Sequence, residues 1–365
     1  MCDNVAYTQM LAVSVKRQIN HKISIMKSDR FENYDKIESL RNSKLIVYIT
    51  GDRPGMETQI HPEILEYFVD HLDPLKKVDK ISLFLYTRGG NTLAAWSLVN
   101  LIRQFCKEFE VIIPSKAQSS GTLISIGANT VVMTKQATLG PIDPSLNGPL
   151  NPQDPRIPQN PTARIPVSVE SIKGYIELSK VDLSIKKEIN LTQILLNLSE
   201  KVHPLVLGDV YRSRTQIQML ARKLLSKQIA ETDKIEKIIA FLTSDSGSHD
   251  YTIYRSEAKD ELGLNIEKPD DELYGIIKEV FNDIKKELEL TTPFDPNLIV
   301  GASPIANYSC RRVLIESIAG GTDVFVSEGT IVKQQQTIPQ PPPLPPLQRT
   351  ILDDNRSFEG WRHEL

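Results

Sequence analysis

Four short apolar runs, separated by segments with helical periodicity, constrain the fold of this chain more than any other feature. The runs are residues 44–50, 80–87, 110–115 and 130–134. The helical segments between them are residues 61–72, 91–107 and 120–128. Strands that are apolar on both faces and alternate with helices are typical of a parallel sheet wrapped by helices. The sequence therefore predicts an α/β fold.

The rest of the chain divides by composition. Prolines crowd residues 141–166, which predicts a loop or extended arm. Helical texture returns from about residue 167 to 243 and again near residues 271–290. We therefore expect the following parts: an N-terminal arm (1–42), a main domain (43–292) that includes the proline-rich loop, a small β-containing extension (293–333) and a proline-rich flexible tail (334–365).

The tail contains the run "PQPPPLPP", which favours polyproline II. Such a run has no core of its own. It is compatible with a flexible tail, and also with a peptide that docks into an aromatic groove of a partner protein.

Composition excludes several kinds of protein. Of the 365 residues, 40% are hydrophobic and 24% are charged, with a net charge of -3 and Lys and Arg scattered along the chain. These values suit a globular protein and give no reason to expect a nucleic-acid surface. Cys2, Cys106 and Cys310 have no CxxC spacing, so we expect neither a disulfide framework nor a zinc site. Cys106 lies at apolar helical spacing, which favours a small core residue.

The N-terminus lacks the basic start and apolar core of a signal peptide. The sequence contains no run of about 18 apolar residues, so we expect no membrane span. We therefore expect a cytoplasmic protein, and we expect no metal because no cluster of residues has metal-ligand spacing.

Two glycine-containing turns carry the candidate chemistry. In "YTRGGNTL", Gly89 and Gly90 follow a strand and precede a helix. Such a turn can expose N–H donors to an oxyanion or a phosphate, although it lacks the P-loop and dinucleotide patterns, and it can also be only a turn. In "AQSSGTL", Ser119 and Ser120 stand where a strand gives way to a helix. A serine here can be a nucleophile or a helix cap.

Because neighbouring parallel strands end at the same edge of a sheet, the two turns are expected to face one cleft. The quoted segments, together with "SSGTL", "GANTVVM" and "LGPIDP" and several helices further along, resemble the serine dehydrogenase proteinase family over roughly residues 44–265. That family is a branch of the Clp protease/crotonase fold, a spiral of β-β-α units. The resemblance implies a serine peptidase with Ser119 as nucleophile, and with Gly89, Gly90 and the Ser120 backbone as oxyanion hole.

The general base is less clear from the sequence. Clp peptidases carry a histidine before a proline after the nucleophile helix, where this chain has Ile142 and Asp143. The related signal-peptide-peptidase branch uses a Ser-Lys dyad, and Lys173 in "SVESIKGYI" lies in a comparable stretch. A lysine desolvated beside a serine can be neutral and act as a base.

Other candidates stay open. They are Lys116 on the strand side of the serine turn, His203 as either a base or a helix-break residue bonded to the backbone, His249 with Asp250, either Asp250 or Glu257 as an orienting group or cap, and Asp143 as a turn residue.

These observations predict a homo-oligomeric serine endopeptidase, of the Ser-Lys type, that acts on peptides or proteins without a cofactor. A catalytically inactive Clp-like scaffold that binds an extended peptide or a partner protein is the alternative, favoured by the missing histidine and the proline-rich tail. An acyl-CoA enzyme on the same fold ranks last, because no basic site for nucleotide phosphates stands out.

Overall fold

A computed structural model of the chain describes residues 30–142, 145–245, 248, 250–338, 340 and 347–364. Its main feature is an eight-stranded sheet in the order β10-β5-β3-β2-β1-β11-β12-β13. The parallel half consists of β1 (Lys44–Thr50), β2 (Val78–Tyr86), β3 (Cys106–Ile113), β5 (Thr130–Met133) and β10 (Ile266–Glu267). The antiparallel half consists of β11 (Ile305–Ser317), β12 (Gly321–Ile338) and β13 (Leu347–Glu364).

Two small sheets complete the strands. One contains β4 (Lys116–Ala117), β6 (Thr138–Leu139) and β9 (Ile253–Tyr254), and the other pairs β7 (Ser145–Leu146) with β8 (Val167–Ser168). Beyond residues 30–41, which are helical, the helices are α2 (Ile64–Leu72), α3 (Thr92–Phe105), α4 (Ser120–Ile126), α5 (Val169–Glu177), α6 (Glu188–Lys201), α7 (Pro204–Leu225), α8 (Thr232–Ala240), α9 (Asp271–Glu287) and α10 (Pro296–Val300). Short helical turns are η1 (Asp73–Leu75), η2 (Leu178–Asp182), η3 (Phe241–Asp245) and η4 (Glu257–Glu261).

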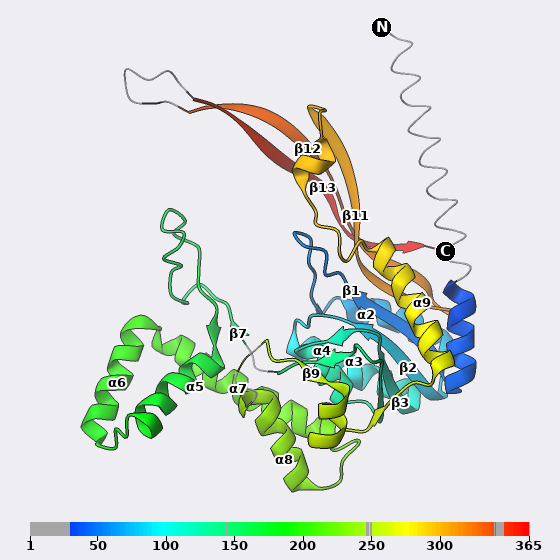
Figure 1. Cartoon of the computed structure of the whole chain (residues 1–365), viewed down its shortest axis with the longest axis horizontal. Coiled ribbons are helices and arrows are strands. Elements are labelled where there is room, and N and C mark those ends of the chain that lie inside the picture. Colours follow the sequence, from blue (N-terminus) through cyan, green and yellow to red (C-terminus); the bar gives the residue numbers. More distant parts are fainter. Residues whose placement is uncertain are drawn as a thin grey trace.

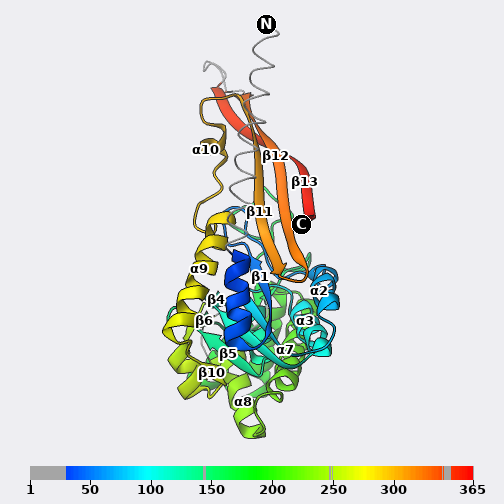
Figure 2. The ribbon, with the colours of Figure 1, turned by 90° about the vertical axis from the view of Figure 1, so that its right-hand side faces the viewer.

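Helices cover both faces of the parallel half of the sheet, as Figure 2 shows. Along β1, Ile46 and Tyr48 pack on one face with α2, α3, α4, α7 and α8. Leu45 and Val47 pack on the other face with helix 30–41 and α9. Alternate side chains of a strand point to opposite faces, so a strand buried on both sides must be continuously apolar. The predicted α/β class is thus confirmed. No helix of the described ranges is both long and apolar enough to cross a bilayer.

Residues 167–214, which contain β8, α5, η2, α6 and the first half of α7, form a part of the molecule that we call the lobe. It lies to one side of the sheet in Figure 1. Its own core is small and consists of Val167, Val169, Leu198, Val202, Val206 and Val210.

Strands β11–β13 form a long arm that extends away from the helices (Figure 1). The flexible tail expected for residues 334–365 is wrong for residues 334–338 and 347–364, because β12 runs to Ile338 and β13 pairs with it from Ile338↔Leu347 to Thr322↔Glu364. Aromatic contacts anchor this strand, since Trp361 stacks on Tyr67 at 4.3 Å between ring centroids and meets Phe325 edge-on. The proline-rich run itself lies outside the described residues, except for Gln340.

Two smaller expectations also change. The helix predicted to end at residue 107 ends at Phe105, and Cys106 begins β3 instead. The predicted N-terminal arm includes helix 30–41, whose Tyr34 and Ile37 are fully buried against the sheet. Residues 1–29 lie outside the described part.

Candidate active site

The first glycine turn follows the carboxyl end of β2. Gly89 and Gly90 have φ angles of 105° and 145°, which side-chain-bearing residues rarely adopt. On one side the turn is bound to Ile60, whose N–H donates to the Gly89 carbonyl and whose carbonyl accepts from Asn91, each at 2.8 Å. A Cβ on Gly90 would lie 2.4 Å from the Ile60 nitrogen. Only glycine fits between these backbones.

The serine turn holds Ser119 in a strained conformation. Its φ of 51° and ψ of -116° lie outside the regions open to side-chain-bearing residues. Ser119 precedes α4 but its side chain makes no capping hydrogen bond, so the capping interpretation does not describe it. The residue is half-buried. Strain of this kind persists only where surrounding structure imposes it, and it concentrates at functional sites.

The two turns lie against one another. A Cβ on Gly89 would be 2.7 Å from Ser119 Cβ and 3.2 Å from Ser119 Oγ. The Ser120 hydroxyl donates to the Gly90 carbonyl at 2.6 Å. Gly121 allows this approach, because a Cβ there would lie 2.5 Å from the Thr87 methyl group. The glycines of both turns therefore allow the end of β2 to lie close to the start of α4.

Backbone donors at this contact are not equivalent. The Gly89 N–H donates to the Thr87 hydroxyl at 3.0 Å, so Gly89 shapes the turn and has no free donor. The N–H of Ser120 belongs to the first residue of α4, where amides lack an intrahelical acceptor. Among the hydrogen bonds of the described residues, none is donated by the Gly90 N–H. Unlike Gly89, Gly90 and Ser120 therefore have no acceptor for their N–H groups among the hydrogen bonds of the described residues.

Lys173 lies on α5, within the lobe. Its ammonium group is 3.5 Å from Glu177, and its side chain is 23% exposed. It lines an apolar cavity of about 540 Å³ together with Ile172, Ile176, Leu198 and Val210. Within the described ranges, no hydrogen bond or ion pair joins Lys173 to Ser119.

The remaining candidates are dispersed. His203 precedes α7 and accepts from the Leu205 N–H at 3.2 Å, the backbone-bonded arrangement that was its alternative interpretation. Glu257 accepts from the Tyr251 hydroxyl at 2.8 Å, and Asp250 is exposed. Asp143 and His249 lie outside the described residues. In the part of the chain that the structure describes, no group of acidic, His and Cys side chains is arranged to hold a metal ion.

Sequence reasoning missed Asp52, which follows β1 at the same edge of the sheet. Its carboxylate pairs with Lys116, accepts from the Tyr86 hydroxyl at 3.0 Å and lies 3.3 Å from Arg88. Burial, followed by the nearby Asp52 charge, raises the pKa of Tyr86 above its usual value. The only local signal was an acidic residue two positions after a predicted strand.

With this geometry in view, similarity to known proteins is informative. The family model described as ClpP-like SDH-type serine proteinase matches residues 72–287. Two uncharacterized proteins of Methanocaldococcus jannaschii, MJ0137 and MJ1495, are 32% and 28% identical over 187 and 186 residues. These matches cover 51% of this chain and 53% and 51% of the two proteins, so the chain spans about half the length of these relatives.

Solved structures with similarity include a variant of the 1510-N membrane-bound stomatin-specific protease, at 13% identity and a TM-score of 0.35, covering 67% of this chain and 86% of that one. ClpP1 from Listeria monocytogenes is 14% identical with a TM-score of 0.33, covering 65% of this chain and 98% of that one.

Proposed function

The chain belongs to the ClpP-like SDH-type serine proteinases, and from this premise we propose that it is a serine endopeptidase with Ser119 as its nucleophile. The observation that carries the proposal is the strained, half-buried Ser119, whose hydroxyl does not cap α4 and which lies against the glycine turn. A purely structural serine at a helix start gains its stability from capping, and this one does not.

The proposed reaction is acyl transfer to Ser119. The Ser119 Oγ attacks the peptide carbonyl carbon, and its proton passes to a base. The developing oxyanion accepts hydrogen bonds from the N–H groups of Gly90 and Ser120. Collapse breaks the C–N bond, and the leaving amine takes the proton from the base. Water, deprotonated by the same base, then attacks the ester carbonyl and releases the acid and free Ser119.

Lys173 is our proposed base, on the basis of the resemblance to Ser-Lys peptidases. Its side chain is largely buried and lines the apolar cavity of about 540 Å³, where it is held by the lobe. The role requires the lobe to bring Lys173 to Ser119 when the enzyme is assembled or bound to substrate. The ion pair with Glu177 instead favours the inactive scaffold, which is the second candidate function.

We also propose that the chain self-associates through the lobe. Nine of its large apolar side chains are 39–75% exposed, among them Val181, Leu183, Ile189 and Tyr211. If each exposes on the order of 100 Å², the set exceeds the ~800 Å² per partner of a standard interface.

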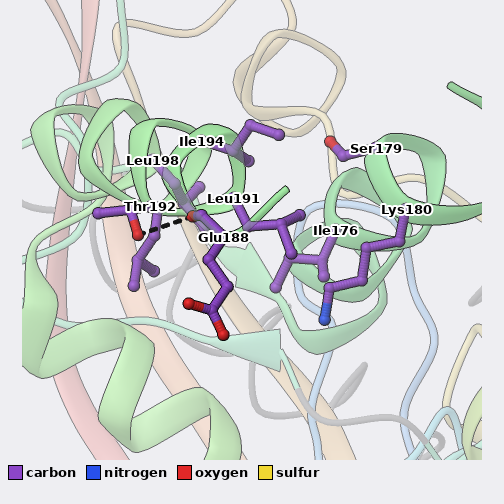
Figure 3. Close-up of a pocket in the computed structure, with 9 residues that line it drawn as sticks. Ile176, Ser179, Lys180, Glu188, Leu191, Thr192, Ile194 and Leu198 are labelled. Atoms are coloured by element: carbon purple, nitrogen blue, oxygen red, sulfur yellow. Dashed lines mark hydrogen bonds between the residues drawn. The ribbon is translucent and has the colours of Figure 1, made fainter. Parts of the chain in front are cut away.

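The lobe also offers the recess that such an interface needs. A second cavity, of about 450 Å³, opens between α5, η2 and α6. Figure 3 shows the apolar side chains of Ile176, Leu191 and Leu198 in this cavity, with Lys180 and Glu188 beside them. Protruding and recessed apolar groups, and charges of both signs, on one lobe suit an interface between two identical copies. A second copy of this chain is therefore the proposed occupant.

The nucleophile is tested by comparing the wild type, Ser119→Ala and Ser226→Ala on casein and a peptide library, with fluorophosphonate labelling in parallel. Ser226 is an exposed serine at the end of α7 and is the matched control. We expect Ser119→Ala to lose labelling and on the order of 10³-fold or more of the cleavage rate, while Ser226→Ala retains both.

Equal cleavage by wild type and Ser119→Ala would overturn the assignment of the nucleophile. A folded wild type that neither cleaves nor labels would favour the scaffold. The cytoplasmic location, the substrate and a partner of the proline-rich run stay predictions from the sequence.

A further inference from the structure

The loop of residues 51–60 connects the C-terminal arm to the glycine turn. At its end, Ile60 is buried and brackets Gly89 and Gly90 by two backbone hydrogen bonds of 2.8 Å. At its start, Gly51 follows β1 and lies against β11, where a Cβ would meet the Arg312 carbonyl oxygen at 2.3 Å. The position of the glycine turn at Gly89 and Gly90 therefore depends on the contacts that hold this loop.

Arg312 holds the loop through its backbone. The pairing of β11 with β12 shifts register between Arg311 and Val313, which leaves Arg312 at a bulge. Its carbonyl accepts from the Gly51 N–H at 2.6 Å and from the Thr58 hydroxyl at 3.0 Å. A carbonyl freed from the ladder by the bulge is thus used to bind the loop.

The Arg312 side chain holds the same loop at two further points. Its Nε donates to the Met56 carbonyl at 3.0 Å, and its Nη2 donates to the Glu57 carbonyl at 2.8 Å. Its Nη1 donates to the Ser327 hydroxyl of β12 at 3.0 Å and lies 3.3 Å from Glu359 of β13. The side chain is only 12% exposed. One guanidinium group therefore connects the loop to two strands of the arm.

The loop is also packed against the arm by apolar contact. Met56 is 2% exposed and lies in a cluster with Tyr308 and Cys310 of β11 and Ile331 of β12. Thr58 donates from its hydroxyl to both the Gly51 and Arg312 carbonyls. Loop and arm thus form one unit, with Arg312 at its centre.

We propose that Arg312 is a positioning residue for the oxyanion hole: by clamping residues 51–60 to the arm, it holds Ile60 against Gly90 and thereby fixes the direction of the Gly90 N–H beside Ser119. This inference rests on the proposed function. It makes the C-terminal arm part of the peptidase site, although among the described residues of the arm no hydrogen bond or ion pair joins one to Ser119, Gly90 or Ser120. An arginine is required, because only a planar guanidinium group donates in several fixed directions at once, whereas a lysine ammonium cannot span the same acceptors.

The test uses the full chain with Arg312→Met, Arg312→Lys and the milder Thr58→Val, which removes one hydroxyl of the clamp. Arg362→Met is the matched control, because Arg362 lies on β13 and pairs with Glu328 of β12. Hydrogen exchange is measured for peptides covering residues 51–60 and 86–91, together with kcat, KM and the rate of fluorophosphonate labelling.

For Arg312→Met we expect faster exchange in both peptides, a kcat and labelling rate lower by roughly 10-fold to 100-fold, and a KM within about twofold, because misplaced donors weaken the transition state more than substrate binding. Arg312→Lys should show nearly the same changes as Arg312→Met. Thr58→Val should change the exchange, kcat and labelling rate by less, and Arg362→Met should change none of them.

Faster exchange at residues 51–60 with unchanged exchange at 86–91 and unchanged kcat would overturn the proposal and leave Arg312 a structural residue. If Arg312→Met does not fold, Thr58→Val decides in the same way. A wild type without turnover would contradict the proposed function, and the exchange at residues 86–91 would then still show whether Arg312 positions the glycine turn.

Discussion

At the scale of single residues, the candidate site is defined by backbone conformations that few residues tolerate. Gly89 and Gly90 occupy the left-handed side of conformational space, and Ser119 accepts strain that glycine would avoid. Serine occupies a position where its backbone conformation is unfavourable, and its hydroxyl does not offset this strain by capping α4. We propose that the chemistry of the hydroxyl, rather than folding, accounts for this choice.

This view predicts opposite effects for two glycine substitutions. Gly90→Ala places a Cβ 2.4 Å from the Ile60 nitrogen at a φ of 145°. It should therefore lower the free energy of unfolding by about 1–3 kcal/mol and abolish labelling of Ser119. Gly208→Ala is the control, because Gly208 lies within α7 with no atom near its Cβ position. It should raise stability by about 0.5–1 kcal/mol.

Urea denaturation measures both variants. A Gly90→Ala protein as stable as the wild type would contradict the close contact between the glycine turn and Ile60.

At the scale of elements, a buried histidine network joins α2 to the arm. His71 of α2 is fully buried; its Nδ1 lies 2.7 Å from the Ser317 hydroxyl of β11 and its Nε2 lies 3.1 Å from Asp323 of β12. The second oxygen of Asp323 lies 3.1 Å from His363 of β13. Three elements, α2, β12 and β13, thus meet at the Asp323 carboxylate, and His71 also links them to β11.

Acid is predicted to weaken this junction. Burial lowers the pKa of His71 below its usual 6.5, although Asp323 opposes the shift and His363 adds to it. Below about pH 6.5 the unfolded chain therefore binds more protons than the folded one, and the free energy of unfolding should fall as the pH is lowered towards the depressed pKa.

His71→Gln should be less stable at pH 7 but should show a smaller loss between pH 7 and pH 5. His61→Gln, at an exposed histidine before α2, is the matched control for removal of an imidazole outside this network. Unfolding measured at several pH values distinguishes these outcomes, and an unchanged slope in His71→Gln would assign the acid sensitivity to other groups.

At the scale of the whole molecule, apolar surface is distributed unevenly. The parallel sheet is buried on both faces, whereas the lobe has a core of only six buried side chains and exposes many large ones. A small helical lobe with this balance gains stability by covering its apolar surface.

Self-association is therefore expected to depend on α6. Ile189→Glu and Leu196→Glu, at side chains 75% and 52% exposed, should convert an oligomer to a monomer in sedimentation velocity at micromolar concentration, because a carboxylate in an apolar interface must be desolvated. Leu298→Glu, at an 80% exposed side chain of α10 outside the lobe, is the control and should not change the oligomeric state. A monomeric wild type at the same concentration would refute the interface.

The sequence predicted the strands of the parallel sheet and the two turns, because both depend on residues that are close together in the chain. Continuous apolar runs such as residues 44–50 show a strand buried on both faces, and Gly-Gly or Ser-Ser-Gly after a strand shows where the chain must turn tightly. It missed β13, since a proline-rich run conceals the pairing of residues 347–364 with β12.

By itself, then, the sequence determined the α/β class and the location of Ser119, Gly89 and Gly90 at turns, because hydrophobic period and turn chemistry are local. Only the tertiary structure decided that Ser119 lies against Gly89, that the Gly89 N–H is engaged by Thr87, and that Arg312 reaches back to residues 51–60. These contacts join residues far apart in the chain, and no local pattern specifies which distant backbone a guanidinium group or a carbonyl will meet.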